Sequence, residues 1–244
     1  MITGKSTGII KEKAMNDFIK AMKIYIRATI KPITLIFGLG TPIAFLSGLI
    51  VDPSKQGDKD YGDMIASMGM IHAMLLIIFF VGNITISQAK FFGSLPHAKK
   101  ILTDVPIVAM GIVCLIFDIS TFTAAFFVCG KETAADLLIV NSVNTVIACF
   151  INASMCKCKG KLYTILSASL FVLFMNQVVI LSRFNLIRNG FGVKIHFAAL
   201  IALSVYIIGF SAVHLFMQWW WNNSGRNYNN SNNAIAQNMV ARDS

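Results

Sequence analysis

Six long runs of apolar residues, separated by short polar segments, dominate the pattern along the chain. Each run is about 20 residues long, which is the length that a helix rising ~1.5 Å per residue needs to cross a hydrocarbon core of ~30 Å. No alternation of polar and apolar residues is long enough to indicate lipid-facing barrel strands. The sequence therefore predicts an all-α polytopic membrane protein with six transmembrane helices, at residues 33–51, 64–86, 105–128, 137–155, 162–181 and 196–221.

The 32 residues before the first run predict an amphipathic interface helix. Apolar residues recur there at helical spacing while the basic residues fall mostly on other faces, as in a helix that lies in the head-group layer. The apolar positions are Phe18, Ile19, Met22, Ile26 and Ile30. Pro32 predicts a break before the first span, because proline disfavours helix at the preceding residue. The alternative is that this leader is a cytoplasmic extension of the first span.

The chain thus divides into three parts. Residues 1–32 form a cytoplasmic leader with the interface helix, residues 33–221 form a six-helix transmembrane domain, and residues 222–244 form an Asn-rich cytoplasmic tail. The tail is poor in apolar residues, so we expect it to be disordered. The leader does not read as a signal peptide, because its apolar run begins too late and no small-residue cleavage pattern follows it.

The distribution of Lys and Arg predicts the orientation of the chain in the membrane. The formal net charge is +10, although only 13% of the residues are charged and 56% are hydrophobic. With six spans, 15 of the 21 Lys and Arg residues fall on the side that holds both termini. The positive-inside rule places that side in the cytoplasm, so we expect a multi-pass protein of the plasma membrane. Anionic lipid and a soluble partner account for the basic excess, and no nucleic-acid partner is expected.

The loop between the second and third runs, residues 88–104, is basic and aromatic. Ser94 could cap a short helix and Pro96 is tolerated in a first turn. Apolar anchors flanked by lysines are suited to docking into a groove with an acidic rim. The alternative is that Phe91 and Phe92 only sit at the membrane interface and that the lysines follow the positive-inside rule.

The stretch Phe91-Phe92-Gly93-Ser94-Leu95-Pro96, followed by a basic segment, resembles the loop after the second span in type-2 permeases of ABC transporters, especially small Gram-positive ones. The resemblance extends to the topology of nearly the whole chain. It implies a coupling helix that contacts a separate ATPase, and these residues would form the coupling site: Phe91, Phe92, Ser94, Leu95, Pro96, His97, Lys99 and Lys100.

The same resemblance implies an exporter of a peptide or an amphipathic small molecule. It would work as a dimer with a second permease copy or paralogue, and with a cytoplasmic ATP-binding subunit. The chain itself is not expected to be an enzyme or to hold a cofactor. Gly4-Lys5-Ser6-Thr7 matches only the end of a phosphate-binding loop, because the earlier glycine of that motif is missing. ATP and Mg are therefore expected on the partner chain.

Asp118 lies midway along the third predicted span. A carboxylate there costs about 2.5 to 3.5 kcal/mol on insertion scales, so it should face other helices or water. Its candidate partners are His72, His214, Asn83 and the Asn176-Gln177 pair, although both histidines, alone on apolar faces, fit better as satisfied packing residues. The candidate translocation path comprises Asp118, Asn83, Asn176 and Gln177. The alternative role is an interhelical hydrogen bond that only holds the bundle together.

Three other classes of protein stay open. An ion-coupled secondary transporter would favour several embedded acids and an internal repeat. An intramembrane enzyme would need paired acids or a histidine-rich metal set, and an accessory or scaffold protein would need neither. A metal site is not expected, because Cys156 and Cys158 lack the spacing and the second ligand pair of a zinc site.

Overall fold

The computed structural model describes residues 3–51, 58–88, 95, 97–156, 168–169, 172 and 191–240. Every helix or strand assigned in this part of the chain is an α-helix, which confirms the predicted all-α class. The elements are α1 (Thr3–Thr29), α2 (Pro32–Val51), α3 (Asp58–Gln88), α5 (Ala98–Leu102), α6 (Asp104–Val128), α7 (Lys131–Met155) and α11 (Ile195–Val240).

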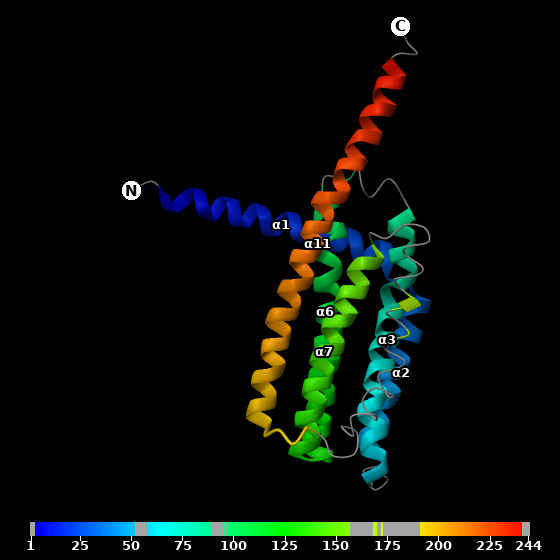
Figure 1. Ribbon diagram of the computed structural model, residues 1–244, viewed down its shortest axis with the longest axis vertical. Coiled ribbons are helices and arrows are strands. Elements are labelled where there is room, and N and C mark those ends of the chain that lie inside the picture. Colours follow the sequence, from blue (N-terminus) through cyan, green and yellow to red (C-terminus); the bar gives the residue numbers. More distant parts are fainter. Residues whose placement is uncertain are drawn as a thin grey trace.

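Helix α1 lies across one end of the bundle (Figure 1). Its segment Met15–Thr29 makes an angle of 90° with Pro32–Gly48 of α2, and Ile30 and Lys31 lie in the break. The predicted break at Pro32 is therefore observed, and α1 is not a straight extension of α2. A proline can begin a helix because its fixed φ and missing N–H are tolerated in the first turn.

Successive residues of α1 face different surroundings. Ala21, Tyr25 and Thr29 are spaced by one helical turn and are fully buried against the bundle. Ile19 and Ile26 lie on another face and are 44% and 40% exposed. The sequence pattern identified the apolar residues of this helix, but it did not identify the buried face, which is centred on Tyr25.

The bundle is arranged around α7. This helix packs against α3, α6 and α11, while α2 packs against α3 and α6. Its membrane-length segment is the most deeply buried of the three such segments, and that of α11 is the least buried. Figure 1 shows α11 along one side of α6 and α7 and the α2–α3 pair along the other.

The expectation of six spans is only partly confirmed. Within the described residues, three helices are long and apolar enough to cross a membrane, or up to four if the bent α1–α2 pair counts as one span. The three are Asp104–Val128, Lys131–Met155 and Ile195–Asn223. Within the side chains that the structure describes, the apolar part of α3 is Ser67–Asn83. The expected span at residues 162–181 lies outside the described residues, apart from residues 168–169 and 172.

Helix α11 extends beyond the last predicted span into the Asn-rich tail. Helix α11 has 46 residues and continues through Val240, so residues 222–240 are helical in the structure. Extending an existing helix costs much less than starting one, because the nucleus has already been formed by the apolar part of α11. No proline interrupts the chain after Pro106, so the Asn-rich composition alone does not end the helix.

Candidate functional site

Asp118 is the centre of a buried polar cluster inside the bundle. Its Oδ1 lies 3.1 Å from Nε2 of His72, and its Oδ2 accepts hydrogen bonds from the hydroxyls of Thr145 at 2.6 Å and Tyr206 at 2.9 Å. These residues, the Asp118 cluster, come from α3, α6, α7 and α11. His72 and Thr145 are fully buried and Asp118 is 2% exposed. Three hydrogen-bonding groups thus surround one carboxyl group.

The cluster lies deep in the bundle. At ~1.5 Å per residue, Asp118 is about 15 Å along α6 from Val128 and about 21 Å from Asp104. The His72 ring is held from its other nitrogen, since Nδ1 lies 2.8 Å from the carbonyl oxygen of Met68. The ring also packs edge-on against Phe117, with centroids 5.6 Å apart. Its orientation is therefore fixed from three sides.

A second buried group of polar side chains joins α1 to the bundle. The Tyr25 hydroxyl donates to Oδ1 of Asn83 at 2.9 Å, and Nδ2 of Asn83 donates to Oδ1 of Asn152 at 2.6 Å. Nδ2 of Asn152 donates to the Tyr25 oxygen at 3.1 Å and to the Pro106 carbonyl at 2.8 Å. The Cys156 thiol donates to Asn83 Oδ1 at 3.1 Å. We call Tyr25, Asn83, Asn152 and Cys156 the Asn83 network.

The Asn83 network connects α1, α3 and α7 directly and reaches α6 through the Pro106 carbonyl. Each side-chain amide in it both donates and accepts, so the network is satisfied in both directions. Burial raises the pKa of the Tyr25 hydroxyl and of the Cys156 thiol, so both groups stay protonated and act as donors.

The backbones of α1 and α3 also approach each other closely beside the Asn83 network. A side-chain carbon added at Gly82 of α3 would come within 2.6 Å of both Cβ and the carbonyl oxygen of Thr29, near the end of α1. Only a glycine lets the two helices approach this closely, as at many helix contacts in membranes. The contact lies one residue before Asn83, so close packing and the hydrogen bonds hold α1 at the same place.

The sequence contained a signal for these contacts. Asn141, Thr145, Asn152 and Cys156 recur along α7 at spacings of four, seven and four residues, which places them on one helical face. All four are buried, and each hydrogen-bonds to another helix. Sequence reasoning examined the acidic residue and missed this polar face of α7, together with Tyr25 and Tyr206.

The candidate translocation residues do not form one group in the structure. Asn83 belongs to the Asn83 network and has no hydrogen bond with Asp118 among the described contacts. His214 lies 3.2 Å from Asp104, not beside Asp118. Of the candidate partners, His72 is the one that the structure brings to Asp118. Asn176 and Gln177 lie outside the described residues.

Half of the predicted coupling residues are described. Leu95, His97, Lys99 and Lys100 are described, whereas Phe91, Phe92, Ser94 and Pro96 lie outside the described residues. The short helix α5 begins at Ala98, with His97 as its N-cap residue, after a turn in which the amide of Ala98 donates to the carbonyl of Leu95. It therefore starts later in the sequence than a Ser94 cap would place it.

Helix α5 packs against α1 and α6. It buries Ala98 and Ile101, while Lys99 is exposed. Nε2 of His97 lies 4.0 Å from a carboxylate oxygen of Asp17 on α1, and both side chains are partly exposed. Helix α5 thus presents Lys99 at the surface and packs against α1 and α6 with its apolar side.

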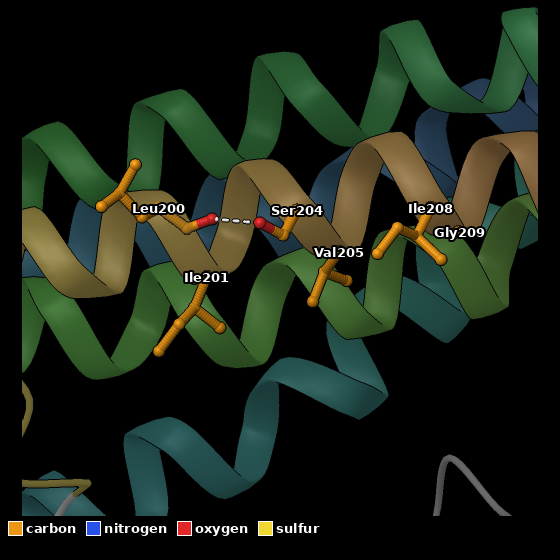
Figure 2. Close-up of a pocket in the computed structure, with 6 residues that line it drawn as sticks. All are labelled: Leu200, Ile201, Ser204, Val205, Ile208 and Gly209. Atoms are coloured by element: carbon orange, nitrogen blue, oxygen red, sulfur yellow. Dashed lines mark hydrogen bonds between the residues drawn. The ribbon is translucent and has the colours of Figure 1, made fainter.

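A pocket on the outer face of α11 is lined by that helix alone (Figure 2). Its lining residues are Leu200, Ile201, Ser204, Val205, Ile208 and Gly209. The single hydroxyl among them donates to the carbonyl of Leu200 at 2.8 Å, so it is already satisfied within the helix. This apolar surface lacks the convergent polar groups of a specific ligand site.

Comparison of the chain with protein-family models, with curated proteins and with solved structures gives no match.

Proposed function

We propose that this protein is the membrane permease subunit of an ABC transporter. In this proposal six spans cross the plasma membrane, both termini lie in the cytoplasm, and a separate subunit binds and hydrolyses ATP. The permease works with a second copy of itself or with a paralogue. It exports a peptide or an amphipathic small molecule, which is the cargo that the family resemblance implies.

The observation that carries the proposal is the arrangement of α1 and α5. A helix lies across the end of the bundle at 90° to α2, and the short basic helix α5 packs against it. In this proposal both helices lie at the cytoplasmic surface of the bilayer, where a soluble subunit could reach them. In the resembling permeases, the equivalent loop seats a coupling helix on the ATPase.

A permease must also transmit movement of its cytoplasmic helices to its spans. The Asn83 network supports such a mechanical connection. Tyr25 of α1 is hydrogen-bonded to Asn83 of α3 and Asn152 of α7, and all three side chains are fully buried. A displacement of α1 would therefore have to move α3 and α7 or break these bonds. Packed elements with discrete arrangements are the usual carriers of such rigid-body changes.

The exposed side of α5 fits an acidic partner surface. Lys99 points outward from α5, whereas Ala98 and Ile101 hold the helix against α1 and α6. Charge complementarity at an interface acts mainly on the association rate and on partner choice. A charge reversal at Lys99 should therefore weaken docking without disturbing the bundle.

The test uses the full-length chain co-expressed with the genes that flank its own, and the readout is co-purification of an ATP-binding subunit. Lys99→Glu is compared with Lys131→Glu, which makes the same charge change at an exposed residue at the start of α7. We expect the Lys99 variant to lose most of the co-purifying subunit and its ATP hydrolysis, and the Lys131 variant to retain both. Equal retention by the two variants would contradict the coupling role of α5.

A further inference from the structure

Helix α1 has a different kind of surface on each of its four sides. Successive residues of an α-helix are about 100° apart around the axis, so residues three or four apart share a side. One side holds Ala21, Tyr25 and Thr29, which are fully buried against the bundle. The other three sides are an exposed apolar strip, an exposed basic side and the side that contacts α5.

The apolar strip consists of Met15, Ile19 and Ile26. All three side chains are exposed, and they lie within about 40° of one another around the helix axis. The centre of the strip is about 100° from the centre of the buried side, so the strip does not face the bundle. A strip of large exposed apolar side chains beside a basic side is typical of a helix that lies in the interface of a membrane.

The basic side consists of Lys20, Lys23 and Arg27. These three exposed side chains lie within about 60° of one another and about 90° from the apolar strip. In the part of the chain that the structure describes, none of them takes part in an ion pair. The basic side points away from the bundle, because it is nearly opposite to Tyr25 around the axis. Its charge is therefore complementary to an anionic surface outside the protein.

The contact with α5 fixes how the other sides of α1 are oriented. Asp17 is about 180° from the apolar strip around the axis. Its carboxylate oxygen lies 4.0 Å from Nε2 of His97, the N-cap residue of α5. The polar contact and the apolar strip are thus on opposite sides of α1. With the strip in the acyl chains, the basic side lies at the level of the head groups, where Lys and Arg can extend to phosphates.

We propose that the basic side of α1 binds the head groups of anionic phospholipids in the cytoplasmic leaflet. Lys and Arg residues near an anionic lipid surface are attracted to it, whereas a zwitterionic surface offers no net charge. The apolar strip contacts acyl chains of either lipid alike, so the basic side is what selects the head group. The proposal rests on the membrane placement of α1 in the proposed function, and it requires no ATP-binding subunit.

The test measures the lipid contacts of the purified full-length protein in mixed vesicles of phosphatidylglycerol and phosphatidylcholine. Photoactivatable forms of the two lipids, identical apart from the head group, are crosslinked, and mass spectrometry counts the crosslinks on residues 15–29. We expect phosphatidylglycerol to crosslink there several-fold more often, because each basic residue favours the anionic lipid by up to about fivefold. Equal crosslinking by the two lipids would overturn the proposal.

The decisive variant is Lys20→Gln with Lys23→Gln. Its matched control is Lys131→Gln with Lys194→Gln, which removes the same charge from two exposed lysines outside α1. The preference for phosphatidylglycerol on residues 15–29 should fall several-fold in the first variant and stay unchanged in the control. An unchanged preference in the first variant would overturn the proposal. Loss of a co-purifying ATP-binding subunit with an unchanged lipid preference would assign the basic side to that subunit and would overturn it as well.

A second measurement tests the orientation of α1 without removing charge. A genetically encoded nitroxide side chain replaces either Ile19, in the apolar strip, or Asn16, an exposed residue on the basic side. Oxygen dissolved in the acyl chains should relax the label at position 19 more strongly, and a water-soluble nickel complex should relax the label at position 16 more strongly. Equal relaxation of both labels by the nickel complex would place both in water and overturn the proposal. Both measurements use the purified chain alone, so their failure is distinct from a failure of the Lys99→Glu comparison.

Discussion

Two of the histidine–aspartate pairs in the described part of the chain have similar lengths and opposite surroundings, and the buried one should be the more strongly coupled. His72 and Asp118 are 3.1 Å apart with side chains 0% and 2% exposed, whereas His214 and Asp104 are 3.2 Å apart with side chains 51% and 26% exposed. Because the residue types and the distances match, a difference between the pairs reports the effect of burial.

The expected coupling free energy between the two side chains of a pair depends on how deeply the pair is buried. Removing one partner of a buried ion pair leaves an uncompensated group and costs about 3 to 5 kcal/mol. Interhelical hydrogen bonds in membranes average only about 0.6 kcal/mol, so the coupling should be smaller than that cost. Hydrogen bonds to charged groups contribute about 1.5 to 3 kcal/mol. We therefore expect a coupling free energy of about 1.5 to 3 kcal/mol between His72 and Asp118. An exposed pair couples by about 0.2 to 1 kcal/mol.

The assay is a double-mutant cycle on each pair, with His→Gln and Asp→Asn substitutions. The free energy of unfolding of the full-length protein is measured by denaturant titration in mixed micelles, at low salt and at about 1 M salt, where the screening length is ~3 Å. Salt should remove the coupling of His214 with Asp104 and leave that of His72 with Asp118 unchanged. A buried-pair coupling no larger than the exposed-pair coupling would refute the reasoning.

Two further predictions concern the contacts that hold α1 against the bundle. Gly82→Ala should lower the free energy of unfolding by about 1 to 3 kcal/mol, because the added carbon overlaps Thr29. The control is Gly40→Ala, which has open space around it and should be neutral or stabilising by up to about 1 kcal/mol. Equal free energies of unfolding for the two variants would argue against the contact between Gly82 and Thr29. Burial raises the pKa of the Cys156 thiol, so its thiolate is scarce even in mildly alkaline solution. Maleimide should therefore label the partly exposed Cys129 before Cys156, as followed by peptide mass spectrometry, and rapid labelling of Cys156 in the folded protein would contradict its place in the Asn83 network.

Composition and periodicity predicted the features that depend on one helix at a time. The apolar runs predicted long helices, and Pro32 predicted the break between α1 and α2, because the steric restriction acts on the neighbouring residue alone. The residue pattern also pointed to Asp118, since a carboxylate in an apolar helix is costly wherever its helix packs. These inferences need no knowledge of neighbouring helices.

The partners of Asp118 could not be predicted in the same way. His72, Thr145 and Tyr206 come from three other helices, and their meeting depends on how each helix is rotated in the bundle. The polar face of α7 was readable from spacing, but its targets were not. Three or four of the six expected spans are found within the described residues, and the expected span at residues 162–181 lies outside them apart from residues 168–169 and 172.

The most direct measurement for the permease proposal is a site-specific photocrosslink from α5 in living cells. A photoreactive amino acid replaces Lys99, on the exposed side of α5, or Lys131, exposed at the start of α7. We predict a crosslink from position 99 to an ATP-binding subunit and none from position 131. Crosslinking from position 131 but not from position 99, or from neither position to any ATP-binding protein, would contradict the coupling role and with it the proposed function.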